Sequence, residues 1–256
     1  MTTAAKIHAI YRYPVKGLSP EPMPSTRLAV GETLPDDRRY AIENGPSRFD
    51  PAAPRHQPKT HYLMLMRNER LAALKTRLEA PSQTLVIAID GREAARGDLG
   101  TAQGRTAIER FFAGFCRDEL RGAPKLLATP GFSFSDVARK VVSIINLASV
   151  AALEEVIGTA IDPLRFRGNV HVSGWPAWRE LDLLGQQITI GSGARLRVVK
   201  RIVRCAATNV DPQTGIRDLA IPAALQRAYG HADCGIYAEV VMPGEIALDD
   251  PVSIDE

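Results

Sequence analysis

The sequence predicts a mainly β protein with short helices. Short apolar or alternating runs recur along the chain, separated by clusters of Pro, Gly and Asp, which is the pattern of strands joined by turns. Only a few segments place apolar residues at helical spacing. Short strands at close spacing with few helices favour a β-barrel or a sandwich, because such sheets must close or pack to bury their apolar faces.

The length of the chain and one loop-like segment bear on its domain organisation. A chain of 256 residues leaves open one long domain or two smaller ones. The segment GFSFSD at residues 131–136 has the composition of a hinge. We therefore expect one domain over residues 1–130 and a second over residues 131–256.

The first half reads as strands interrupted by two helices. The expected strands are Lys6–Tyr13, Ser25–Val30, Arg38–Glu43, His61–Met66 and Leu85–Asp90. Several prolines between residues 14 and 24 predict a loop between the first two strands, because proline has no N–H to donate. One helix is expected after a cap at Asn68, with Leu71, Leu74 and Leu78 on one face, and another over about Ala102–Cys116, whose cysteine ends an apolar face.

The second half repeats the strand pattern. Its expected strands are Val141–Ile145, Asn169–Ser173, Gln187–Ile190, Arg195–Val203 and Gly235–Val241. A helix over about Val150–Ile157 is expected to start at an N-cap, Ser149, and to end at Gly158. A second, short helix is expected over Pro222–Tyr229.

Composition excludes several classes of protein. Thirty-two Lys and Arg against 29 Asp and Glu give a net charge of +3, too mild to indicate nucleic-acid binding. No apolar run approaches the ~20 residues of a membrane span, and the first residues lack the apolar core of a signal peptide, so a cytoplasmic protein is expected. Three cysteines form neither a disulfide framework nor a zinc pattern, which favours reduced thiols.

The most unusual segment is Arg195–Cys205. It reads as a strand with a basic residue at nearly every second or third position, and it ends in a cysteine. Cations near a thiol favour its thiolate form. The residues alone leave two interpretations open, a solvated basic strand with a buried thiol or a reactive cysteine. No P-loop, dinucleotide-binding GxGxxG, GxSxG elbow or HExxH motif offers a rival site.

Segments of the second half resemble a known family. The run RCAATNVDPQTGIRD at Arg204–Asp218 resembles the MOSC pattern RCxxTxxDPxTG, and RFRGNV at Arg165–Val170 resembles RFRPN, with Gly168 where proline is usual. Also similar are SIINLASVAALEE from Ser143, ELDLLGQQITIG from Glu180 and GIYAEVVMPGEIALDD from Gly235. These segments occur in the family's order. The resemblance implies a MOSC β-barrel, the fold of the C-terminal domain of molybdenum-cofactor sulfurases.

The first half carries a second resemblance. IYRYPVKGL at residues 10–18 and DDRRYAI at residues 36–42 are similar to the MOSC N-terminal β-barrel domain. Leu18 stands where that domain commonly has cysteine, and Tyr40 where it has tryptophan. The paired arrangement resembles the mitochondrial amidoxime-reducing components and their bacterial relatives, and implies an N-terminal β-barrel-like domain followed by the MOSC barrel.

The resemblance assigns roles to individual residues. Cys205 matches the cysteine whose thiolate ligates molybdenum, which makes it the expected catalytic and metal-binding residue. Residues matching contacts to the molybdopterin cofactor are Lys16, Gly17, Arg38, Ser149, Arg167, Asn169, Arg204 and Tyr237. The residues alone favour a different interpretation, in which Lys16 is a solvated turn residue and Arg38 pairs with Asp36 or Asp37. Ser149 is explained as well by its cap position.

The implied function is that of a molybdenum-cofactor enzyme. It would reduce small N-oxygenated compounds with electrons from a separate ferredoxin- or flavin-type donor, since no flavin or iron–sulfur motif is present. Nucleic-acid and membrane partners are not expected. One alternative is a sulfur carrier with a persulfide on Cys205; no pyridoxal phosphate site is evident, so desulfuration would need a partner. Another is a non-enzymatic cofactor carrier.

Overall fold

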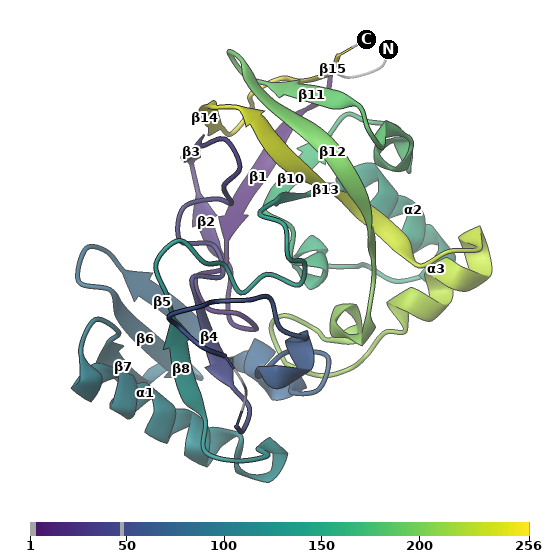
Figure 1. Cartoon of the computed structure of the whole chain (residues 1–256). Helices are drawn as coiled ribbons and strands as arrows, with labels where there is room; N and C mark the ends of the chain where they lie inside the picture. Colours follow the sequence, from purple (N-terminus) through teal and green to yellow (C-terminus); the bar gives the residue numbers. More distant parts are fainter. Residues whose placement is uncertain (1–3, 47–48, 256) are drawn as a thin grey trace.

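The structure is mainly β, as the sequence predicts. The computed structural model describes residues 4–46 and 49–255. Its largest element is an eight-stranded sheet, curled into a half-barrel, that fills the upper part of Figure 1. Across this sheet the strands follow in the order β15 (Val252–Ile254), β11 (Gln187–Ile190), β12 (Ala194–Val203), β13 (Asp233–Met242), β9 (Val142–Asn146), β10 (Val170–Ser173), β1 (Lys6–Arg12) and β2 (Glu21–Met23).

The curl brings the start of the chain against its end. Lys6 of β1 forms an antiparallel bridge with Pro251, directly before β15. The N–H of Val252 donates to the carbonyl of Ala5 at 2.8 Å. Figure 1 shows β1 and β15 meeting at the same end of the molecule. The first strand is thus built into the sheet formed by the second half.

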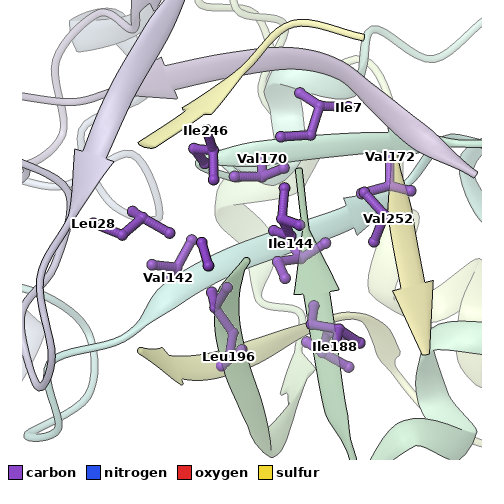
Figure 2. Close-up of a cluster of buried hydrophobic side chains, with 14 of the residues drawn as sticks. Ile7, Leu28, Val142, Ile144, Val170, Val172, Ile188, Leu196, Ile246 and Val252 are labelled. Atoms are coloured by element: carbon purple, nitrogen blue, oxygen red, sulfur yellow. The ribbon is translucent and has the colours of Figure 1, made fainter. Parts of the chain in front are cut away.

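The main apolar core lies inside this curl (Figure 2). Alternate residues of the strands point inward, as the period of a half-buried strand requires. Ile7 comes from β1, while Leu28 and Ile246 come from a separate pair formed by β3 (Ser25–Leu28) and β14 (Gly244–Ala247). Full burial of one such side chain stabilises the fold by roughly 1.5–3 kcal/mol. Residues from both ends of the chain therefore share one core.

The remaining first-half residues form a smaller unit with its own core. It contains the pair β4 (Tyr40–Glu43) and β8 (Lys125–Ala128), and a three-stranded sheet of β5 (Lys75–Glu79), β6 (Thr84–Ile89) and β7 (Arg92–Asp98). Helix α1 (Ala102–Phe115) packs on β7 and buries Ile108 and Phe112, as its apolar spacing predicts. Cys116 follows it and is buried in the same cluster. This unit occupies the lower left of Figure 1.

Two further α-helices cover the curled sheet, α2 (Leu147–Ile157) and α3 (Ile221–Tyr229). Gly158 and Gly230 end them in the left-handed conformation. Single 3₁₀ turns complete the structure: η1 (Lys59–His61), η2 (Glu69–Ala73), η3 (Arg117–Glu119), η4 (Pro163–Phe166), η5 (Arg179–Leu183) and η6 (Ala206–Asn209). Among the described residues, no helix has the length and apolar character needed to cross a bilayer.

The helix predicted after Asn68 is wrong. Only the 3₁₀ turn η2 forms there, and the chain is extended again at Leu74 before entering β5. The Asn68 side chain does not cap the turn, because its Oδ1 accepts the N–H of Met64 at 3.0 Å and its Nδ2 donates to Glu119 Oε2 at 2.6 Å. On β5, Leu78 is buried between partly exposed neighbours. Spacing that suits one helix face also suits a short turn followed by a strand.

Other local expectations are corrected. The proline-rich segment expected as a loop contains β2, which includes Pro22 and lies at the sheet edge, where a missing N–H costs no ladder bond. No strand covers His61–Met66; Tyr62 forms only an isolated bridge with Glu43. The cap of α2 is Asn146, whose side chain accepts the N–H of Ala148.

The expected division near residue 130 stays a prediction. That position falls in the connection between β8 and β9. From the first half, β1 pairs with β10 and β3 pairs with β14, both in the second half, while β2 pairs with β1.

Helix α1 approaches β7 so closely that side chains are excluded at the contact. A Cβ placed on Gly104 would lie 2.0 Å from the carbonyl oxygen of Asp98, whereas one on Gly114 of the same helix would meet nothing within 4 Å. Gly104→Ala should therefore lower the free energy of unfolding by ~1–3 kcal/mol, because the backbone must shift. Gly114→Ala should raise it by up to ~1 kcal/mol through helix propensity. Urea denaturation measures both; equal effects would refute the close contact.

Candidate functional site

A cavity of about 250 Å³ lies where the first-half turns meet the curled sheet. Cys205 enters it directly after β12, at the start of η6, and is partly buried. Most of the residues singled out in the sequence line the same cavity: Lys16, Gly17, Arg38, Arg167, Asn169, Arg204, Cys205 and Tyr237. They come from segments separated by more than a hundred residues, and only the fold brings them together.

Ser149 does not line this cavity. It is buried in the first turns of α2, where its hydroxyl donates to Glu180 Oε2 at 2.9 Å and accepts the N–H of Trp178 at 2.8 Å. Asn146 donates to the same carboxylate. Burial raises the pKa of Glu180, and these donors oppose that rise. Ser149 therefore belongs to a buried polar network behind the sheet.

Two of the lining residues use their side chains in hydrogen bonds within the protein, mostly to the backbone. Arg204 Nε donates to the carbonyl of Cys234 at 2.7 Å, and its Nη1 donates to that of Phe166 at 2.8 Å. Asn169 accepts from the N–H and hydroxyl of Ser143 and donates to the carbonyl of Tyr11. Because these side-chain groups already form hydrogen bonds within the protein, both residues hold the walls of the cavity in place and leave few donors for a ligand.

Arg38 and Arg167 lie on one aromatic ring. Their guanidinium carbons are 4.5 and 4.3 Å from the centroid of Tyr13. Arg38 pairs with Asp37 at 2.5 Å and donates to the carbonyl of Arg167 at 2.9 Å, so the pairing with a neighbouring aspartate that the sequence left open does form. Both arginines have left-handed backbones, with φ of 49° and 52°, an uncommon conformation that costs free energy in a non-glycine residue.

Arg167 has a donor to spare. Its Nη1 donates to the carbonyl of Leu18 at 2.9 Å. In the part of the chain that the structure describes, its buried Nη2 has no hydrogen-bond partner. Burial, together with the nearby Arg38, lowers the pKa of Arg167 to about 10 against the opposing contribution of Tyr13. An unpaired buried guanidinium N–H costs roughly 1–3 kcal/mol and marks a place where an acceptor would be favourable.

A chain of charges connects Lys16 to the cysteine. The buried Lys16 ammonium donates to the carbonyl of Phe134 at 2.9 Å and pairs with Asp136. Lys59 Nζ lies 3.7 Å from the other oxygen of Asp136 and 3.3 Å from Cys205 Sγ. The ammonium of Lys59 is therefore a hydrogen-bond donor to the sulfur of Cys205.

Burial and pairing oppose each other in this chain. Burial lowers the pKa of Lys16, and Asp136 only partly compensates. Burial would raise the pKa of Asp136, but Lys16 and Lys59 outweigh it and hold that pKa well below its usual range. Burial also lowers the pKa of Lys59, while Asp136 and Cys205 outweigh it and raise the pKa. Asp136 is thus held as a carboxylate between the ammonium groups of Lys16 and Lys59.

Lys59 and Asp136 were missed in the sequence. Lys59 follows a proline-rich stretch without a recognisable motif, and Asp136 lies in the segment expected as a hinge. The other two cysteines are buried away from the cavity, and burial raises the pKa of Cys116 and of Cys234 to about 12. Over residues 4–46 and 49–255 there is no cluster of three His, Cys, Asp or Glu that could hold a metal ion.

The loop after Cys205 is fixed by Arg165. The buried guanidinium forms two parallel bonds of 2.8 Å to Asp218, a 3.1 Å bond to Asp211 and a 3.2 Å bond to the carbonyl of Asn209. Such bidentate pairing combines direction with charge. The same arginine also lines the cavity. It thereby ties the position of Cys205 to the turn η4.

Comparison with known proteins identifies the second half. Residues 128–253 match the family model of the MOSC domain. These residues form a MOSC domain. The match includes the segments from Ser143, Arg165, Glu180, Arg204 and Gly235 that resemble the family in sequence.

Solved structures give similar but distant matches. The YuaD protein from Bacillus subtilis is 16% identical over 98% of this chain and 94% of its own, with a TM-score of 0.46. YiiM from Geobacillus stearothermophilus is 21% identical over 45% of this chain, and YiiM from Escherichia coli is 17% identical over 45%, with TM-scores of 0.36 and 0.34. Each match spans 54% of the YiiM chain. No curated protein matches the sequence.

The MOSC domain departs from its family pattern at Gly168. A Cβ there would lie 2.3 Å from Cγ1 of Ile145, a buried residue of β9. Proline, the usual residue, carries a Cβ and would collide in this backbone. Glycine therefore lets the chain at residue 168, between Arg167 and Asn169, lie directly against β9 of the sheet.

Arg165 should control the order of the MOSC loop at residues 206–218. Arg165→Lys keeps the charge but loses the two parallel bonds to Asp218, so we expect the free energy of unfolding to fall by ~1–2 kcal/mol. Hydrogen exchange should accelerate across the loop. The matched control is Arg139→Lys, whose exposed pair with Glu239 should change stability by less than ~1 kcal/mol. Equal loop protection in both variants would contradict this role.

Proposed function

We propose that this chain binds molybdenum cofactor in the cavity beside Cys205 and reduces small N-oxygenated compounds. The observation that carries the proposal is the unpartnered, buried Nη2 of Arg167, in a cavity that also holds Lys16, Arg38 and an accessible thiol. Free cationic donors and a thiol in one cavity are the two kinds of group that an anionic, metal-bearing cofactor requires.

The residues present fit the group. A cysteine sulfur is a suitable ligand for molybdenum, and Lys59 Nζ lies 3.3 Å from Sγ, where it would also be close to an anionic group bound beside the cysteine. A phosphate is best held by an arginine fork together with the point charge of a lysine. Asp136 already places an anion among Lys16, Lys59 and Arg38, which supports the cavity's preference for negative charge.

The chain's own residues would then have separate tasks. Cys205 would ligate the metal, while Lys16, Arg38 and Arg167 would hold the phosphate. Arg204 and Asn169 would keep the walls in place through their backbone bonds, and Tyr237 and Gly17 would close the sides. When bound, the cofactor would supply two-electron oxygen-atom chemistry.

The overall reaction needs an external source of electrons. Conversion of a hydroxylamine or amidoxime N–OH to N–H consumes two electrons and two protons and releases water. We propose a separate ferredoxin- or flavin-type protein as the donor.

The contact between Lys59 and Cys205 also supports a second candidate function. A thiol beside an ammonium can equally hold a terminal persulfide sulfur, whose negative charge the same lysine would stabilise. On that proposal the chain would be a sulfur carrier loaded by a partner enzyme. Mass measurement of the purified chain distinguishes the two, since a persulfide adds one sulfur atom to Cys205 and no metal.

Cys205→Ser tests the proposed metal ligand. Protein expressed in cells that make the cofactor should lose most of its molybdenum and all reductase turnover, because a hydroxyl is a far poorer ligand for this metal than a thiolate. Cys234→Ser and Cys116→Ser are the controls, with stability losses of ~1–3 kcal/mol but unchanged metal per folded molecule. Elemental analysis reports the metal; full occupancy in Cys205→Ser would overturn the assignment.

The proposed phosphate site can be tested with inorganic phosphate alone. Lys16→Ala or Arg38→Ala should weaken phosphate binding about ten- to a hundredfold, since each charge-assisted bond contributes ~1.5–3 kcal/mol. Arg38→Lys should fall between wild type and Arg38→Ala, because it keeps the charge but loses the fork.

Asp136→Asn should have the opposite effect and tighten phosphate binding about tenfold, because it removes the competing carboxylate. Arg139→Ala, an exposed cation outside the cavity, should leave binding unchanged. Calorimetric titration at two salt concentrations measures all of these. Wild-type affinity in Lys16→Ala, Arg38→Ala and Asp136→Asn would exclude the site.

A further inference from the structure

A second cavity, of about 210 Å³, lies beside the first. Gly17, Leu65, Arg165, Arg167 and Ala207 line both cavities and form the partition between them. The remaining walls of the second cavity come from the first-half turns, the turn η4 and the loop after Cys205. They are Leu18, Ser19, Pro20, Ala72, Lys75, Leu164, Val210, Pro212 and Gln213. The proposed cofactor leaves this space unused.

Most of the walls of the second cavity are apolar. Leu18, Leu65 and Val210 are buried, and each presents a side chain that belongs to no polar contact. A cavity of ~150 Å³ lined by apolar side chains is large enough to hold benzene. A single ring with one small substituent is therefore the size of ligand that this space suits.

One face of the cavity is different, because it carries buried donors. Arg165 is almost completely buried, and its Nε has no hydrogen-bond partner among the residues that the structure describes, although its two Nη atoms are saturated. Arg167 adds a guanidinium with a free Nη2. An acceptor in the cavity would meet a donor that is already desolvated and already held in place by ion pairs.

The charges around the cavity select an anion. Arg167 and Lys75 line it as cations, and the described lining includes no carboxylate, although Asp211 and Asp218 outside the lining neutralise Arg165. The carboxylates that pair with Arg165 occupy its Nη side, away from Nε. An apolar wall with one cationic face is the environment of an organic anion with a hydrophobic body.

The rim of the cavity is held by one hydrogen-bonded contact. Lys75 Nζ donates to Gln213 Oε1 at 2.8 Å and to the carbonyl of Pro212 at 3.2 Å, across the gap between β5 and the loop. Both side chains are exposed, so the contact can open at little cost. A ligand could enter here without passing through the first cavity.

We propose that this second cavity binds a small carboxylate with an aromatic or branched aliphatic body. Its carboxylate would accept from Arg165 Nε, and its body would lie against Leu18, Leu65 and Val210. The site does not depend on cofactor or metal. Because Arg167 stands in the partition, a carboxylate here would lie next to whatever occupies the first cavity.

Benzoate is the probe for this site, with benzyl alcohol as its neutral counterpart. Titration of the metal-free full chain should give a benzoate dissociation constant at least ten times lower than that of benzyl alcohol. Amide NMR shifts should concentrate at Leu18, Ser19 and Val210. Equal affinity for both compounds would overturn the choice of an anion, and no binding of benzoate at millimolar concentration would overturn the site.

A filling variant locates the binding. Ala72 lines only the second cavity, so Ala72→Phe should weaken benzoate at least tenfold while leaving phosphate binding unchanged. The control is Val156→Phe, at an exposed position of α2 that lines neither cavity. Unchanged benzoate affinity in a folded Ala72→Phe would exclude this cavity. If Ala72→Phe does not fold, the NMR shifts of wild type decide.

The two proposals can fail separately. Benzoate binding by the wild-type chain, together with no molybdenum uptake in cells that make the cofactor, would leave the second cavity standing and refute the cofactor. Molybdenum uptake without benzoate binding would do the reverse.

Discussion

Strand β1 is the element on which the cavity depends, because it fixes the first-half cations against the MOSC sheet. The N–H of Tyr11 donates to the carbonyl of Asn169 at 2.7 Å, and the Asn169 side chain returns a bond to the carbonyl of Tyr11. Two residues further on, the N–H of Tyr13 donates to Asp37 Oδ1 at 2.8 Å, and the carbonyl of Tyr13 accepts the N–H of Arg38 at 2.7 Å. Lys16 follows directly. Through these bonds, β1 and the residues after it fix Lys16 and Arg38 relative to the MOSC sheet that carries Cys205.

This arrangement stores unfavourable energy. Arg38 and Arg167 both adopt left-handed backbones on the face of one tyrosine, where their like charges repel. Burial adds a cost that Tyr13, Asp37 and Asp136 partly offset. Such strain persists where the surrounding structure holds it, and it concentrates at sites that bind or react. A bound anion would relieve the repulsion and fill the open donor of Arg167, so binding should also stabilise the fold.

Helices and strands could be predicted from the sequence wherever the local pattern of apolar residues agrees with the tertiary packing. Helix α1 and strand β11 fall where spacing predicts them, because their apolar residues face a core on one side only. Strand β7 (REAARGD) could not be found, since it is mostly exposed and held by backbone pairing with β6. For the cavity, sequence motifs pointed to Cys205, Arg38, Arg167 and Arg204 as site residues. Lys59 and Asp136 carry no motif, because they lie in irregular segments whose position only the fold determines.

Arg165 and Arg167 show how one short turn can serve two spaces. They flank Phe166, and the turn directs Arg165 toward the loop carboxylates and Arg167 toward Leu18 and Tyr13. Arg165 is neutralised by acidic partners, whereas the bonds of Arg167 are to a carbonyl and a ring. In the partition between the two cavities, Arg165 is therefore fixed by its ion pairs with the loop, whereas Arg167 has no carboxylate bonded to it among the described residues and keeps one donor open. A charge that enters either cavity changes the field at Arg167, which gives the two spaces a direct route of coupling through a single side chain.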